Sequence, residues 1–140
     1  MREQLGMDYQ IPLSVGSIAN FVKTGANNLR ELEFDLKVNN QLTKASVAHA
    51  DETSVNIDGG KYWLHTFSND HYAWMEPHKK RGAEAVDCID IIPRYQGVLC
   101  HDNWSTYSKY DNCHHSTCNS HHLRELEWSF ENEKQHWLKR

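Results

Sequence analysis

Hydrophobic positions in the first third of the chain recur with the period of an α-helix. Ser14 can cap a first helix, and Gly25 is expected to end it. The apolar positions of this helix are Val15, Ile18, Phe21 and Val22. A second amphipathic helix follows, with apolar positions Leu29, Leu32 and Leu36. Residues 1–45 are therefore predicted to form a helical lead-in segment at the periphery of the protein.

From residue 47 the period changes to two, which is the period of a β-strand. One face of this strand would hold Val47, His49, Asp51, Thr53, Val55 and Ile57. The opposite face would hold Ala48, Ala50, Glu52, Ser54 and Asn56. Because the branched apolar residues gather on the first face, we expect Asp51 to lie on the apolar side of the strand and Glu52 on the polar side.

Two more extended runs follow this strand, KYWLHTF and HYAWMEP. The joints between the three runs are the turn-forming stretches Asp58-Gly59-Gly60 and Ser68-Asn69-Asp70. We therefore predict an antiparallel meander of three strands. The next stretch, RGAEAVDCIDIIP, returns to helical spacing and is closed by Pro93.

The last third of the chain begins with GVLCHDNW, a short apolar run typical of a strand covered on both faces. One or two helical turns between Trp104 and Tyr110 and an extended piece, HHSTCN, are expected next. A long helix is predicted to start near Ser120, with Leu123, Leu126, Phe130 and Trp137 along one stripe. This order of elements predicts a mixed α/β fold with helices packed on a sheet over residues 46–140.

Composition and charge fit one globular domain. The chain has 140 residues, of which 39% are hydrophobic and 24% charged. Its net charge of -4 argues against a broad basic surface, so any contact with nucleic acid would have to be local. No apolar run reaches the length of a membrane span, and the start lacks the apolar centre of a signal peptide. We therefore expect a cytoplasmic protein without a membrane partner.

Asp51 and Asp102 are the acids that the pattern singles out. Asp51 is expected on an apolar face, and Asp102 ends a buried strand. Two buried carboxylates repel each other unless a divalent cation lies between them, and hard oxygen ligands suit Mg²⁺ or Mn²⁺. From spacing alone another reading stays open, in which Asp51 pairs with a Lys or Arg and Asp102 caps the next helical turn at Trp104.

Several separate motifs coincide with one known family. The blocks HADET, KYWLH, KKRGAEAVDCIDIIPRYQGVLCHDNWSTY and CHHSTCNSHHLREL, in this order, resemble the central region of transposases of the insertion sequence 66 family. The resemblance runs from about Leu13 to the last residues. It implies a ribonuclease H-like mixed sheet, with a three-strand antiparallel meander plus parallel strands flanked by helices, C-terminally incomplete. It also implies an Asp-Asp-Glu triad whose two aspartates fall on Asp51 and Asp102, with Glu52 as a structural neighbour.

The same resemblance implies a function. Asp51 and Asp102 would hold Mg²⁺ or Mn²⁺ for phosphodiester hydrolysis and strand transfer in DNA transposition. The DNA partners would be the ends of the element and the target DNA, in the bacterial nucleoid. The protein partners would be further copies of the chain in a homo-oligomer, or a full-length transposase. The third acid of the triad has no match here, so we expect a truncated core without full activity alone. The alternatives are a non-catalytic transposase remnant and a small zinc-binding interaction module.

Two further groups of residues are candidates for binding. The tract CHHSTCNSHH offers four tetrahedral zinc ligands, Cys113, His115, Cys118 and His122. Candidate contacts to the DNA backbone are Lys79, Lys80, Arg81, His122 and Arg124. The simpler interpretation of the basic cluster is a solvated turn, and Arg124 could equally pair with Glu127.

Overall fold

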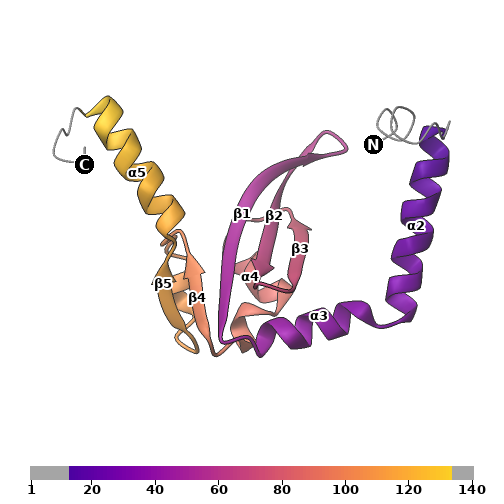
Figure 1. The fold of residues 1–140 in the computed structure, drawn as a ribbon, viewed down its shortest axis with the longest axis horizontal. Coiled ribbons are helices and arrows are strands. Elements are labelled where there is room, and N and C mark those ends of the chain that lie inside the picture. Colours follow the sequence, from indigo (N-terminus) through magenta and orange to yellow (C-terminus); the bar gives the residue numbers. More distant parts are fainter. Residues whose placement is uncertain (1–12, 134–140) are drawn as a thin grey trace. The chain divides into compact units, whose positions relative to one another are not determined.

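The computed structural model describes residues 13–133 (Figure 1). The chain divides into two compact units, residues 1–37 and residues 38–140. Helix α2 (Val15–Glu31) belongs to the first unit, and helix α3 (Phe34–Thr43) begins in the first unit and ends in the second. Among residues 13–133, no helix is both long enough and apolar enough to cross a lipid bilayer.

Helix α2 starts as predicted and ends later than predicted. The Ser14 hydroxyl accepts a hydrogen bond from the Ser17 N–H at 3.0 Å, which is the expected N-cap. The prediction that Gly25 ends the helix is wrong, because α2 continues to Glu31. A single glycine inside a helix costs only about 1 kcal/mol, which the remaining turns can offset. No residue of α2 is buried.

Helix α3 corrects the prediction that all of residues 1–45 are peripheral. Its residues Val38 and Leu42 are buried and belong to the hydrophobic core of the second unit. The spacing of these two residues, one helical turn apart, places both on the same side of the helix. The end of α3 is therefore part of the core that supports the sheet.

Five strands form one mixed sheet in the order β3-β2-β1-β4-β5. The strands are β1 (Val47–Ile57), β2 (Gly60–Ser68), β3 (Ala73–His78), β4 (Val98–His101) and β5 (His114–Thr117). Strands β1, β2 and β3 are antiparallel neighbours, whereas β4 runs parallel to both β1 and β5. The predicted meander and the predicted mixed sheet with flanking helices are confirmed.

The turn between β1 and β2 shows why the meander could be predicted. Asp58 and Gly59 form a two-residue loop with φ angles of 51° and 79°. Positive φ at both positions matches the twist of a tight hairpin, and Gly59 adopts it without a steric cost. The Gly59 N–H donates to the Asn56 side chain at 2.9 Å, which closes the turn.

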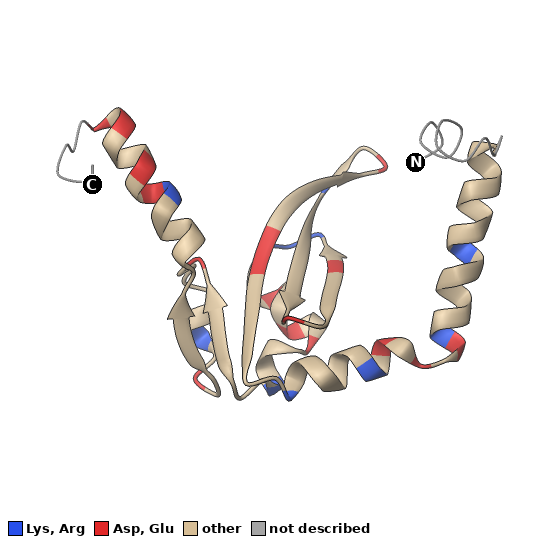
Figure 2. Cartoon of the chain, in the orientation of Figure 1, with Lys and Arg blue, Asp and Glu red and all other residues tan. Residues whose placement is uncertain are grey.

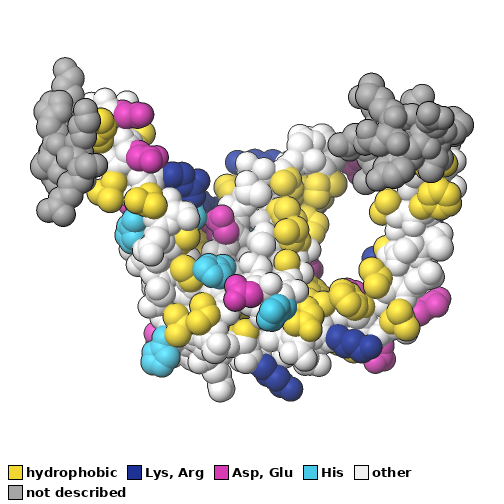
Figure 3. Space-filling model, viewed as in Figure 1, with side chains coloured by type: hydrophobic (Ala, Val, Ile, Leu, Met, Phe, Trp, Pro, Cys, Tyr) yellow, Lys and Arg dark blue, Asp and Glu magenta, His cyan; other side chains and the backbone are white. Residues whose placement is uncertain are grey.

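Among residues 13–133, helices cover one face of the sheet and leave the other open. Helix α4 (Ala83–Ile89) and the short 3₁₀ helix η1 (Ile92–Arg94) pack behind β1, β2 and β3 (Figure 1). The core between these layers contains small residues of β1, Ala48 and Ala50, and larger residues such as Phe67. On the open face, hydrophobic side chains reach the surface over β2 and β3 (Figure 3). Met75 of β3 is among the exposed ones.

The predicted facing of β1 is wrong. Ala48, Ala50 and Glu52 are buried, whereas Val47 and Asp51 are exposed. The branched residues misled the prediction because they lie towards the ends of the strand, outside the covered part. In the covered part, small alanines allow a close approach of the packed layer, and the buried acid is neutralised by its partners. Asp51 therefore lies on the open face of the sheet.

The last elements follow the predicted order. Strand β4 has Leu99 and His101 buried but Val98 and Cys100 only half-buried, so it is not covered on both faces. The 3₁₀ helix η2 (Tyr107–Lys109), strand β5 and helix α5 (Asn119–Asn132) come next. The expected stripe of α5 is solvent-exposed at Leu123 and Leu126, and Trp137 lies outside the described residues.

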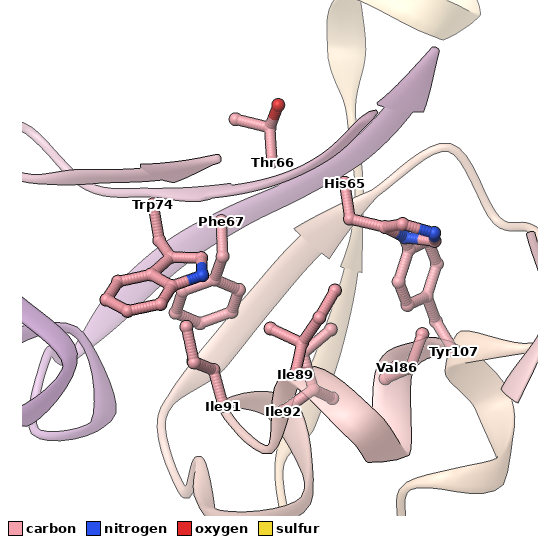
Figure 4. Close-up of a pocket in the computed structure, with 9 residues that line it drawn as sticks. All are labelled: His65, Thr66, Phe67, Trp74, Val86, Ile89, Ile91, Ile92 and Tyr107. Carbon is pink, nitrogen blue, oxygen red and sulfur yellow. The ribbon is translucent and has the colours of Figure 1, made fainter. Parts of the chain in front are cut away.

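A small cavity lies between the sheet and α4. Its volume is about 20 Å³, and its walls come mainly from apolar side chains of β2, β3, α4 and the segment after α4. Figure 4 shows Phe67 and Trp74 at one end of it and His65 and Tyr107 at the other. This volume fits about one water molecule and no substrate, so the functional site has to be sought elsewhere.

Candidate functional site

Asp51 and Asp102 lie at matching positions of neighbouring strands. The parallel register of β1 and β4 pairs Val47 with Val98 and His49 with Cys100. Continued by two residues, the same register sets Asp51 opposite Asp102, which directly follows β4. The continued register therefore gives the two predicted acids, distant in sequence, corresponding positions on neighbouring segments. The position is at the carboxyl end of a parallel strand, where open α/β sheets commonly bind ligands.

Each of the two carboxylates makes one local hydrogen bond. Oδ1 of Asp51 accepts the Glu52 N–H, and Oδ1 of Asp102 accepts the Trp104 N–H, both at 2.9 Å. The second bond is the contact predicted by the alternative interpretation, in which Asp102 caps the turn at Trp104. Within residues 13–133, neither aspartate forms a salt bridge with a Lys or Arg. The alternative interpretation, in which Asp51 pairs with a Lys or Arg, therefore has no support there. The second oxygen of each aspartate remains available for a cation.

Glu52 has the opposite environment from its neighbour. Its side chain is 1% exposed, and Arg81 donates to its Oε1 from Nε at 2.9 Å and from Nη2 at 2.6 Å. The hydroxyl of Tyr107 donates to Oε2 at 2.6 Å. A buried carboxylate is tolerated only when it is paired and hydrogen-bonded, and Glu52 meets both conditions. Glu52 is thus structurally engaged, as expected from the resemblance.

Arg81 is held on both sides by aromatic rings. Its guanidinium carbon lies 4.9 Å from the ring centroid of Trp63 and 4.4 Å from that of Trp104. These cation–π contacts add to the ion pair with Glu52. The residue is therefore fixed between β2, β1 and the segment after β4. Its predicted role as a DNA contact competes with these structural contacts.

Tyr107 lies where the negative charges of the site converge. Burial is the largest cause of its raised pKa, followed by the hydrogen bond to Glu52 and the charges of Glu52, Asp102 and Asp51. Each of these causes disfavours the phenolate. Tyr107 is therefore a neutral donor throughout the pH range in which the protein is handled.

His101 and His115 form a chain of hydrogen bonds behind the Asp102 segment. Nδ1 of His101 accepts the Asn103 N–H at 3.0 Å, so its Nε2 carries the proton and donates to Nδ1 of His115 at 3.0 Å. Nε2 of His115 then donates to the carbonyl of Tyr110 at 3.1 Å. Burial and the neighbouring His115 lower the pKa of His101, which keeps the ring neutral. The chain orders the turn that follows Asp102.

The four predicted zinc ligands do not converge. Cys113 is buried against the carbonyl of Tyr110, whereas His122 lies 3.9 Å from the carboxylate of Glu125. In the part of the chain that the structure describes, no group of three or more His, Cys, Asp or Glu side chains is arranged to hold a metal ion. The tract forms β5 and the start of α5 instead.

Cys118, at the N-cap of α5, has an unusual thiol. A hydrogen bond from the side chain of His121 is the main cause that lowers the pKa of Cys118 to about 7, assisted by the N–H groups of His121 and Ser120. These groups stabilise the thiolate. The thiolate of Cys118 therefore stabilises the folded protein. This stabilisation is fully present above the pKa of the thiol in the unfolded chain, near 9, and is lost as the pH falls through about 7.

We expect Cys118 to be the most readily alkylated cysteine near neutral pH, with its rate reaching half of its plateau at about pH 7. The measurement is iodoacetamide labelling of the folded protein followed by mass spectrometry across pH 5–10. His121→Ala should move the midpoint upward, because the main stabilising group is removed. A midpoint of the parent near pH 9 would contradict the described hydrogen bonds.

The predicted DNA contacts are dispersed. Lys79, Lys80 and His122 are exposed. Nε of Arg124 donates a hydrogen bond to the carbonyl of Ser120, in the same helix, at 3.4 Å. Lys and Arg positions are scattered along the described elements (Figure 2). A grip on DNA by these residues would therefore be local.

The sequence did not indicate the residues that surround Glu52. Trp63 falls in a predicted strand and Tyr107 in a predicted helical turn, and neither position indicates a contact with Glu52. The available signal was the pairing of an acid with small residues on one face, since an acid among alanines needs a partner. The identity of that partner, Arg81, depends on tertiary packing across β1 and the segment before α4.

Comparisons with known proteins give a family and distant structural likenesses. The solved structures include the HTLV-2 integrase catalytic core domain in complex with magnesium. The trimeric form is 14% identical with a TM-score of 0.42 and covers 63% of this chain and 70% of that chain. The dimeric form is 13% identical with a TM-score of 0.40 and covers 64% and 74%.

The simian T-cell lymphotropic virus intasome in complex with PP2A regulatory subunit B56 gamma is also similar. It is 15% identical, with a TM-score of 0.41, over 64% of this chain and 42% of that chain. Among curated proteins, none matches the sequence. The Transposase IS66 family, in contrast, matches residues 2–140. That match spans nearly the whole sequence, and the chain therefore belongs to the Transposase IS66 family.

Proposed function

We propose that this chain is the catalytic core region of a DNA transposase in which Asp51 and Asp102 hold Mg²⁺ or Mn²⁺. The observation that carries the proposal is the register of β1 and β4, continued to the two aspartates. Family membership supports it, because transposases act on DNA phosphodiesters. The reactions are hydrolysis that frees the 3′ ends of the element and strand transfer of those ends into target DNA.

The donor set suits a hard divalent cation. Each aspartate offers a carboxylate oxygen without a protein partner in residues 13–133, and carboxylate oxygens are the ligands that Mg²⁺ and Mn²⁺ prefer. When bound, such ions activate a water or 3′-hydroxyl and stabilise the leaving oxygen. Asp51 lies on the open face of the sheet, which leaves room for a DNA strand. The residues proposed to contact the phosphates of this strand are the basic residues Lys79, Lys80, His122 and Arg124. The reaction would take place in the bacterial nucleoid.

Metal binding tests this proposal directly. We expect Asp51→Asn and Asp102→Asn each to weaken Mn²⁺ binding by about tenfold or more, because each removes one charged ligand. The measurement is electron paramagnetic resonance of free Mn²⁺ in titrations of the full chain at pH 7.5. Asp58→Asn is the matched control, since Asp58 lies in the exposed turn between β1 and β2 and Asn tolerates its positive φ. Equal affinity in the parent and both site variants would refute the shared site.

A second candidate is a non-catalytic transposase core that keeps the fold and associates with copies of itself or with a full-length transposase. It is favoured by the lack of a third His, Cys, Asp or Glu grouped with the two aspartates within residues 13–133. Nicking of a supercoiled plasmid in the presence of Mn²⁺ distinguishes the two. Nicking that depends on both aspartates supports the enzyme, whereas Mn²⁺ binding without nicking supports the second candidate.

A further inference from the structure

Glu52 uses its whole carboxylate within the protein. Its Oε1 accepts two bonds from Arg81, and its Oε2 accepts the hydroxyl of Tyr107. With the side chain 1% exposed, neither oxygen faces the open side of the sheet, where its neighbour Asp51 lies. Glu52 is thus an acid beside the proposed metal site that is not itself available as a ligand.

The contacts of Glu52 join the two segments that carry the aspartates. Glu52 follows Asp51 directly on β1, and Tyr107 belongs to η2, which closes the segment that begins at Asp102. Arg81 adds a second link, because it binds Glu52 and lies 4.4 Å from the ring centroid of Trp104 in that same segment. The Trp104 N–H in turn donates to Asp102 at 2.9 Å. A continuous series of contacts therefore runs from Asp51 to Asp102 beneath the open face.

We infer that Glu52 and Tyr107 are positioning residues, which hold the Asp102 segment against β1 and so set the separation of the Asp51 and Asp102 carboxylates. The inference rests on the proposed function, because it assigns these residues a task only if the two aspartates share a cation. Metal sites need their ligands held by such supporting hydrogen bonds, whose loss weakens binding. A bond of 2.6 Å to a buried carboxylate is a short, charge-assisted contact suited to this task.

Tyr107→Phe tests the inference, because it removes a single hydroxyl and keeps the ring contacts with His101 and Trp104. We expect Mn²⁺ affinity to fall by about tenfold. Tyr110→Phe is the matched control: its hydroxyl is also a hydrogen bond donor to a carboxylate, that of Asp87 at 2.7 Å, and the residue is 8% exposed. Both variants lose one such bond, so we expect both to lose stability. A loss of Mn²⁺ affinity in Tyr107→Phe alone then identifies Tyr107 as a positioning residue.

Amide hydrogen exchange of the metal-free protein gives an independent readout. The Trp104 amide should exchange faster in Tyr107→Phe than in the parent and should be unchanged in Tyr110→Phe. Unaltered Mn²⁺ affinity in Tyr107→Phe, or the same loss in both variants, overturns the inference. If Mn²⁺ binding in the parent does not depend on Asp51 and Asp102, the proposed function fails instead. In that case the role of Tyr107 in setting the metal site falls with the proposed function, and the exchange of the Trp104 amide shows only whether Tyr107 orders the Asp102 segment.

Discussion

Replacing Gly97 with alanine is expected to lower the free energy of unfolding of the second unit by about 3 kcal/mol. A Cβ at this position would collide with the carbonyl of Ala45 and the hydroxyl of Tyr95 and would lie 2.7 Å from the carbonyl of Ser46. These atoms cannot move aside easily, because the Ser46 carbonyl accepts the Val98 N–H at 2.8 Å. The strain falls at the junction of β1, β4 and β5, where the Gly97 carbonyl also accepts the first amide of β5 at 2.9 Å.

Urea unfolding followed by circular dichroism measures this loss, and Gly82→Ala is its control. A Cβ at Gly82 meets no atom within 4 Å, and Gly82 has a negative φ as the N-cap of α4. The cost of that substitution is the weaker capping by alanine, about 1 kcal/mol or less. Similar unfolding midpoints for the two variants would show that the backbone at Gly97 is not packed as described.

Arg81→Met is expected to destabilise the second unit by about 3 kcal/mol, because it leaves the carboxylate of Glu52 buried without a cation. This value is at the lower end for a broken buried pair, since the Arg81 side chain is 39% exposed and solvent screens part of the interaction. Methionine keeps much of the volume between the rings of Trp63 and Trp104, so lost packing contributes little. The measurement is urea unfolding at pH 7.

Arg94→Met provides the comparison for this prediction. Arg94 pairs with Asp90 at 2.9 Å, and both side chains are about half exposed, at 47% and 59%. An exposed pair of this kind contributes about 1 kcal/mol or less. Equal losses in Arg81→Met and Arg94→Met would mean that Glu52 is reached by water in solution.

The fold could be predicted from the sequence where local chemistry determines it. The Asp58-Gly59 turn fixes the hairpin of β1 and β2, and the change from a period of two to helical spacing marks α4. The pairing of β1 with β4 could not be read from periodicity, because parallel strands meet through a long crossover whose register depends on packing. The family resemblance implied parallel strands beside the meander, and the sheet order agrees with this implication.

The facing of β1 marks the limit of a pattern that counts apolar residues. Val47 and Ile57 suggested a buried face, yet the chain buries Ala48, Ala50 and Glu52. Burial depends on which residues the helical layer covers, and this layer requires small side chains where it approaches the strand. A carboxylate enters such a face only with partners from elsewhere, and Arg81 and Tyr107 lie far from Glu52 in sequence.

The candidate site was predicted in part. Asp51 and Asp102 were singled out as a pair, and the register of the two strands agrees with that pairing. The Cys and His residues near β5 were grouped by closeness in sequence. Cys113 and His115 do lie in contact, at 4.0 Å, but within residues 13–133 no group of three or more His, Cys, Asp or Glu side chains is arranged to hold a metal ion. The thiol of Cys118 gains its character from the first turn of α5, which the sequence placed only approximately.

The register of the sheet has a consequence for the order in which the chain assembles. Strands β1, β2 and β3 pair with strands that are adjacent in sequence, whereas Val47 of β1 pairs with the distant Val98 of β4. Closing a longer loop costs more conformational entropy, so contacts within the meander are favoured early and the β1–β4 contact late. The alignment of the two aspartates is then among the final events of folding. A chain emerging from the ribosome would bring Asp51 and Asp102 into register only after residue 102 has docked, when most of the sheet already exists.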